Sequence, residues 1–184
     1  MKNVLVLLAP GFEETEAVSV IDILRRAEIK VTIAGLEKDT IKGSHGISLR
    51  TDIFYENVPL NDYDVLFLPG GQPGAQNLKN DRKVLNMVQQ FDKQGKLIAA
   101  ICAAPIVLHE AGILTDKHIT SYPSEEEKLL HTNYHIEDVI RDGNIITSRG
   151  VGTTLDFALT LVEIIKGKDS SDQLAERILW KKRI

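Results

Sequence analysis

The chain has 184 residues, a formal net charge of −4 and one cysteine. The length suits one domain with a sizeable core, so we expect residues 1–184 to form a single domain. The charge balance provides neither the basic surface of a nucleic-acid-binding protein nor a polybasic membrane anchor, and one cysteine excludes an internal disulfide. The apolar start of the chain ends at Pro10-Gly11, which favours a first strand over a signal peptide, and no apolar segment approaches membrane-spanning length. These features predict a cytoplasmic protein without a nucleic-acid or membrane partner.

Apolar segments of strand length alternate along the chain with segments whose apolar residues follow helical spacing. The predicted strands occupy residues 4–9, 29–34, 65–68, 96–101 and 118–121, and the predicted hairpins span residues 41–49 and 139–147. The predicted helices occupy residues 12–27, 84–94, the segment after Cys102, residues 153–165 and residues 170–180. This order predicts an α/β fold with a mostly parallel sheet and helices on both faces. Ligands of such sheets bind beyond the carboxyl ends of the strands, where the turns 10–14, 69–71 and 102–104 lie.

Cys102 directly follows the predicted strand 96–101 and is followed by Ala103-Ala104-Pro105. A proline suits the first turn of a helix, so the sulfur is expected at a sharp strand-to-helix turn, facing the helix N-terminus. The helix dipole would favour a thiolate, which predicts a lowered pKa of Cys102 and a reactive nucleophile. The alternative is an inert core residue, the usual state of a free cysteine, and position alone does not decide between the two.

Two further turns could complete a site around Cys102. The Gly71 N–H could pair with the Ala103 N–H as an oxyanion hole, although Gly-Gly also marks ordinary tight turns. Glu16 shares one helix face with apolar residues, which predicts a buried carboxyl with a raised pKa that can move protons beside Cys102. Glu14 lines up with apolar residues equally well, so periodicity leaves both open. Acids in a first turn can also simply complement the helix dipole.

Other candidate sites are weaker. His131 and His135 are four residues apart, but no acidic ligand is spaced to complete a metal site, so a solvated loop is the better interpretation. We expect His45 and His118 at the surface, and His109 packed or solvent-facing on the helix after Cys102. Residues 148–154 are glycine-rich before a helix that Thr153 or Thr154 could cap. They lack the lysine of a phosphate loop and the dinucleotide spacing, so we expect no nucleotide, no metal and no other cofactor.

Four motifs occur in an informative order: LAPGFEETE at residues 8–16, LPGGQPGAQNL at 68–78, IAAICAAP at 98–105 and TSRG at 147–150. Together they resemble the ThiJ/PfpI superfamily, in the branch that contains the parkinsonism-associated deglycase and bacterial YajL-like proteins. The resemblance covers residues 2–168. It implies a flavodoxin-like three-layer sandwich with a cysteine elbow, and a homodimer. It also implies Cys102 as nucleophile, Glu16 as its partner carboxyl, and Gly71 and Ala103 as backbone donors.

Two departures from the family bear on activity. Many relatives carry a histidine where Tyr122 stands here, and tyrosine, with an ordinary pKa of about 10, is a poor base at neutral pH. The protease-like branch carries histidine directly after the cysteine, where this chain has Ala103. Both departures argue against an intracellular cysteine peptidase.

The resemblance implies a cysteine-dependent, cofactor-free stress-protection enzyme of the glyoxalase or deglycase type. Its substrate would be a small reactive dicarbonyl, an aldehyde or a glycated molecule. One alternative is a redox sensor and stress chaperone that works through oxidation of Cys102 to sulfinic acid. Another is a scaffold that only binds, with Cys102 in its core.

Overall fold

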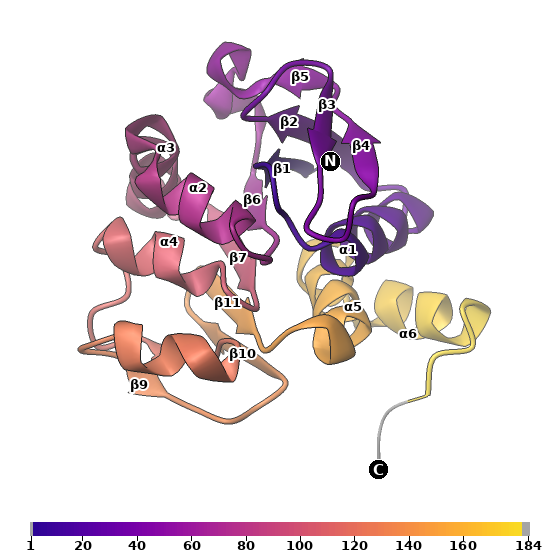
Figure 1. Cartoon of the computed structure of the whole chain (residues 1–184). Helices are drawn as coiled ribbons and strands as arrows, with labels where there is room; N and C mark the ends of the chain where they lie inside the picture. Colours follow the sequence, from indigo (N-terminus) through magenta and orange to yellow (C-terminus); the bar gives the residue numbers. More distant parts are fainter. Residues whose placement is uncertain (1, 182–184) are drawn as a thin grey trace.

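The computed structural model describes residues 2–181, and its centre is a seven-stranded sheet (Figure 1). The strand order is β10-β11-β7-β6-β1-β2-β5. The strands are β1 (Asn3–Leu8), β2 (Lys30–Gly35), β5 (Ile53–Phe54), β6 (Val65–Leu68), β7 (Leu97–Ile101), β10 (Val139–Asp142) and β11 (Ile145–Ser148). All neighbours pair in parallel except the β10–β11 hairpin, so the predicted mostly parallel sheet is confirmed.

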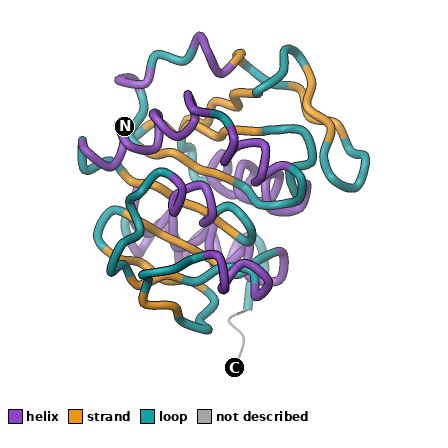
Figure 2. Tube along the Cα trace, turned by 60° about the vertical axis from the view of Figure 1, so that its left-hand side comes forward, coloured by secondary structure: helices purple, strands orange, loops and turns teal. Residues whose placement is uncertain are grey.

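Helices cover both faces of this sheet, as Figures 1 and 2 show. One layer contains α2 (Gly74–Asn80), α3 (Arg82–Lys93) and α4 (Pro105–Glu110). The other contains α1 (Glu14–Arg26), α5 (Thr154–Lys166) and α6 (Lys168–Arg177). The predicted three-layer α/β sandwich is therefore confirmed.

The strands read as continuous apolar runs because both of their faces are buried. In β1, Leu5 and Leu7 point into the core shared with α3 and α4, whereas Val4 and Val6 point into the core shared with α1 and α5. This alternation follows the two-residue repeat of a strand. The register aligns the carboxyl ends of β1, β6 and β7 at one edge, from which the turns that contain the motifs emerge.

Two small sheets lie outside the central one. The predicted hairpin at 41–49 is confirmed as β3 (Thr40–Lys42) and β4 (Ser48–Arg50), which pair antiparallel. The predicted strand 118–121 is shorter, as β8 (His118–Ile119), and it pairs with β9 (Asn133–Tyr134), which the sequence did not reveal. Within residues 2–181, no helix is long and apolar enough to cross a membrane.

Candidate active site

Cys102 occupies the turn between β7 and α4, as predicted. Its backbone has a φ of 63°, a left-handed conformation that is strained for a residue with a side chain. Its N–H donates to the Ser148 carbonyl at 2.9 Å, and its own carbonyl accepts from the Tyr122 N–H at 2.8 Å. Pro105 takes the first position of α4. The surrounding structure thus holds the sulfur at a strained elbow at the carboxyl end of β7.

Glu16 is the acidic residue that faces this elbow. Its side chain is completely buried, and Oε2 accepts a hydrogen bond of 2.8 Å from the Gly70 N–H. Burial raises the pKa of Glu16 to about 7, against the opposing effects of the neighbouring Cys102 thiol and of the Gly70 N–H. Oε1 is buried, and among residues 2–181 it has no hydrogen-bond partner other than the neighbouring Cys102 thiol. The choice that periodicity left open is settled, because Glu14 points instead to the β3–β4 hairpin.

The prediction of a lowered Cys102 pKa is corrected by this geometry. Burial raises the pKa of the thiol, and an ionised Glu16 raises it further, which outweighs the N–H groups of Gly71 and Ala103 directed at the sulfur. Two buried anions in contact repel strongly, so the pair retains one proton at neutral pH. A thiolate forms when that shared proton lies on Glu16. The helix-terminus argument failed because it considered neither desolvation nor the neighbouring carboxylate.

The two glycines after β6 have different tasks. A Cβ on Gly70 would lie 2.6 Å from the Cys102 Cβ and 2.8 Å from Glu16 Oε2, so only glycine lets the thiol and the carboxyl meet here. Gly71 has a φ of +91°, and a Cβ there would overlap the backbone of Glu13. The sequence predicted Gly71 as a site residue and missed Gly70, whose role depends on a contact between distant segments.

Tyr122 and Gly150 border the same space. A Cβ placed on Gly150 would lie 3.5 Å from Tyr122 Cδ2, 3.8 Å from Cys102 Sγ and 3.9 Å from Glu16 Oε1. The Tyr122 side chain is half exposed. Gly150 belongs to the TSRG motif, but its place beside the sulfur follows only from the pairing of β11 with β7.

The histidines and the threonine that the sequence analysis considered form hydrogen bonds or contacts with residues other than Cys102. His131 lies in an exposed turn and His135 in a loop after β9, as the solvated-loop interpretation predicts, and Nε2 of His135 lies 2.7 Å from Nδ1 of His118. His109 Nε2 lies 3.0 Å from the Leu130 carbonyl. The Thr153 hydroxyl binds Gly150 and Ser148 rather than capping α5, which begins at Thr154.

Comparison with known proteins agrees with this architecture. Residues 2–164 match the model of the DJ-1/PfpI family. The chain is 41% identical over 181 residues to protein dj-1beta of Drosophila melanogaster, with 97% of both chains covered. The crystal structure of Drosophila melanogaster DJ-1beta superimposes with a TM-score of 0.95, at 40% identity over 98% of this chain and 99% of that one.

A further relative is the glutathione-independent glyoxalase DJR-1.2 of Caenorhabditis elegans. It is 32% identical over 176 residues, with 94% of each chain covered. The family match, the identities and the shared fold extend over nearly the whole chain. The chain therefore belongs to the DJ-1/PfpI family.

Proposed function

We propose that the protein is a cysteine-dependent, cofactor-free stress-protection enzyme that converts reactive dicarbonyls, of the glyoxalase or deglycase type. The observation that carries the proposal is the contact of the strained Cys102 with the fully buried carboxyl of Glu16, whose pKa is about 7. A pKa near the working pH is what a group needs to donate and accept protons within one cycle. The name of the Caenorhabditis elegans relative, a glyoxalase that needs no glutathione, supports the same chemistry.

The proposed cycle begins when the shared proton lies on Glu16 and Cys102 is a thiolate. The sulfur adds to the aldehyde carbon of a 2-oxoaldehyde, and the proton passes from Glu16 to the new oxygen, giving a hemithioacetal. Glu16 then removes the hydrogen on that carbon as a proton and returns it to the adjacent carbonyl carbon, while the hydroxyl proton of the hemithioacetal passes to the former carbonyl oxygen, which leaves a thioester of a 2-hydroxy acid. Water hydrolyses the thioester, releasing the acid and restoring the thiol. Every proton stays within the pair, the substrate and one water molecule.

The backbone donors fit this cycle. The N–H groups of Gly71 and Ala103 are directed at the sulfur, so they can also reach an oxygen on the carbon bonded to it. Cys102 is only partly buried, and Tyr122 and Gly150 lie beside its sulfur. The test is consumption of methylglyoxal with identification of the hydroxy-acid product, on the wild type beside Cys102→Ala.

The second candidate function is a redox sensor and stress chaperone, and the same N–H groups favour it. A sulfinate on Cys102 carries two oxygens, and the donors at the sulfur together with a protonated Glu16 could bind them. The chain has no second cysteine that could trap a sulfenic acid as an internal disulfide.

Mild oxidation should therefore convert Cys102 to sulfinic acid, with two equivalents of peroxide consumed and two oxygens gained. We expect the melting temperature of the oxidised protein to stay unchanged or to rise, because the pocket supplies donors for the charged product. Peptide mass spectrometry and a thermal melt measure both effects. Oxidation that falls mainly on Met1 or Met87, or a sharp drop in melting temperature with Cys102 modified, would rule out a pocket suited to this acid.

We also propose a cytoplasmic homodimer. A lone free thiol suits a reducing compartment. Helices α1 and α5 pack against each other, and α5 also packs against α6. Three apolar side chains are exposed here: Val18 of α1 (42%), Val151 just before α5 (48%) and Leu155 of α5 (41%). Val151 and Leu155 line one hollow together with Thr15 and Ser19 of α1, and exposed apolar side chains of this kind suit a twofold interface with a second copy of the chain.

Sedimentation should give about twice the 20.5 kDa mass of the chain at micromolar concentration. Leu155→Glu should shift the protein to the monomer mass, because it places a charge in the proposed interface. Leu130→Glu is the matched control, since Leu130 is equally apolar and 61% exposed but lies in the loop before β9. Wild-type sedimentation as a monomer contradicts the proposal.

A further inference from the structure

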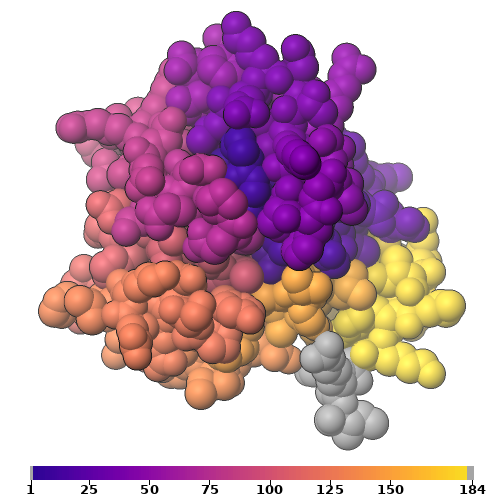
Figure 3. Space-filling model, in the orientation of Figure 1, coloured from indigo at the N-terminus to yellow at the C-terminus, as the bar shows by residue number. Residues whose placement is uncertain are grey.

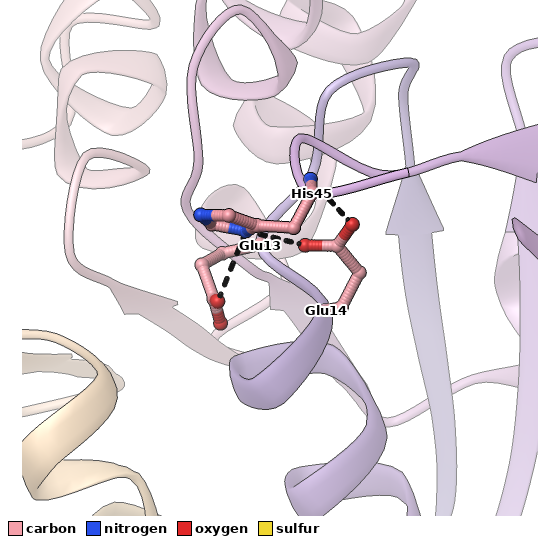
Figure 4. Close-up of side chains that lie close together, drawn as sticks. All are labelled: Glu13, Glu14 and His45. Atoms are coloured by element: carbon pink, nitrogen blue, oxygen red, sulfur yellow. Dashed lines mark hydrogen bonds and ion pairs between the residues drawn. The ribbon is translucent and has the colours of Figure 1, made fainter. Parts of the chain in front are cut away.

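Outside the Cys102 pocket, three ionisable side chains from distant parts of the chain converge at the start of α1 (Figure 4). Glu13 and Glu14 come from the beginning of the helix, and His45 comes from the tip of the β3–β4 hairpin. One ligand atom of each residue lies within 4.8 Å of the other two. In Figure 3 the hairpin atoms (purple) lie over the N-terminal segment (indigo), so this junction is at the protein surface.

Glu14 is fixed rigidly in this cluster. Its Oε1 accepts from the backbone N–H of His45 at 2.6 Å, and its Oε2 lies 2.9 Å from His45 Nδ1. The hairpin therefore holds both oxygens of Glu14 in place, and the position of this carboxylate needs no further ordering.

Glu13 contributes an oxygen that the protein does not use. Only 8% of the residue is exposed, and its Oε2 accepts a hydrogen bond of 2.7 Å from the Glu16 N–H. Oε1 receives no hydrogen bond from residues 2–181, and His45 Nδ1 lies 3.8 Å from it, too far for one. This Glu13 oxygen faces the His45 nitrogen without a bond between them, so a cation could bridge the two.

We propose that Glu13, Glu14 and His45 form a binding site for a divalent transition-metal cation of the zinc class, which joins the β3–β4 hairpin to α1. The ligands would be Oε1 of Glu13, Oε2 of Glu14 and Nδ1 of His45. Bonds of about 2.0–2.2 Å to one ion place two ligand atoms about 3–4 Å apart. The separation of 3.8 Å from Nδ1 to Glu13 Oε1 lies in that range, and the separation of 2.9 Å to Glu14 Oε2 lies at its lower end.

The donor set also predicts selectivity. An imidazole nitrogen suits zinc and its neighbours, whereas Mg²⁺ and Ca²⁺ prefer oxygen ligands alone. The N-terminus of α1 carries about half a positive charge, which two carboxylates outweigh. His45 is 71% exposed, so the ion can enter from solvent and keep water in its remaining positions. Zinc bound at Nδ1 would replace the direct contact between His45 Nδ1 and Glu14 Oε2.

The test is titration calorimetry of the full chain with Zn²⁺, Mg²⁺ and Ca²⁺. His45→Gln removes the metal-binding nitrogen but keeps an N–H donor for Glu14, and Glu13→Gln removes the charge but keeps an acceptor for the Glu16 N–H. We expect one Zn²⁺ per chain, at least about tenfold weaker binding in each variant, and little binding of Mg²⁺ or Ca²⁺. Zn²⁺ should also raise the melting temperature of the wild type more than that of His45→Gln.

Two control variants test whether Zn²⁺ binds at the proposed site rather than elsewhere in the protein. His118→Gln disrupts the other imidazole pair and Cys102→Ala removes the thiol, and both should keep wild-type Zn²⁺ affinity. Circular dichroism without metal checks that each variant is folded. The proposal is overturned if wild type binds no Zn²⁺, if folded His45→Gln binds it equally well, or if either control loses it.

Discussion

Replacing Cys102 with alanine should abolish dicarbonyl turnover, with a fall in kcat/KM of at least about 10³-fold, because the nucleophile is lost. Glu16→Gln should lower turnover by about 10²–10⁴-fold. The amide can still occupy the buried position and accept the Gly70 N–H, but it cannot return a proton to the substrate. Chromatographic measurement of the hydroxy acid, beside loss of the dicarbonyl, checks both variants.

Alkylation by iodoacetamide measures the reactivity of the Cys102 thiol separately from the proton transfer assigned to Glu16. Glu16→Gln should leave the thiol reactive, whereas Cys102→Ala should not be labelled at all, since Cys102 is the one cysteine in the chain. Full turnover in Glu16→Gln would assign the proton transfer to another group. Turnover that survives in Cys102→Ala would remove the enzyme mechanism altogether, and the redox role would then be the better explanation of the pocket.

The architecture was largely predictable because the central strands are buried on both faces and the longer helices are amphipathic. The elements that the sequence missed are short and depend on neighbours. α2 begins after the Gly-Gly turn in a segment with few apolar residues, and β5 is a two-residue edge strand that exists only by pairing with β2. Local patterns cannot reveal an element whose stability comes from a distant partner.

For the candidate site, the sequence allowed a prediction of which residues come together but not of their electrostatics. Cys102, Glu16, Gly71 and Ala103 do converge, and the motif order carried that information. The pKa of the thiol depends on how deeply the sulfur is buried and on which carboxyl faces it, and neither follows from residue spacing. Gly70 was not predicted as a site residue for a similar reason. The absence of its Cβ matters only because the fold brings α1, β6 and the Cys102 elbow into contact.

The buried carboxyl should make the protein less stable as the pH rises. The pKa of Glu16 is about 7 in the folded state against an ordinary value of 4.5. Between these values the folded state binds more protons than the unfolded state, so the free energy of unfolding falls with increasing pH. The stabilisation from protonated Glu16 is complete below pH 4.5 and is lost as the pH rises through about 7. A shift of this size corresponds to about 3 kcal/mol.

Glu16→Gln should therefore stabilise the protein by up to about 3 kcal/mol at pH 8, with no gain at pH 4, while it lowers turnover. Glu14, on the same helix, provides a control in which the expected change in stability has the opposite sign. The pKa of Glu14 is lowered to about 2, so its carboxylate stabilises the fold above pH 4.5, and Glu14→Gln should destabilise it at pH 8. Urea unfolding of the three proteins from pH 4 to pH 8 measures both effects. Equal stabilities of wild type and Glu16→Gln at pH 8 would show that Glu16 ionises in the folded protein without cost, and the shared-proton description of the Cys102 pair would then fail.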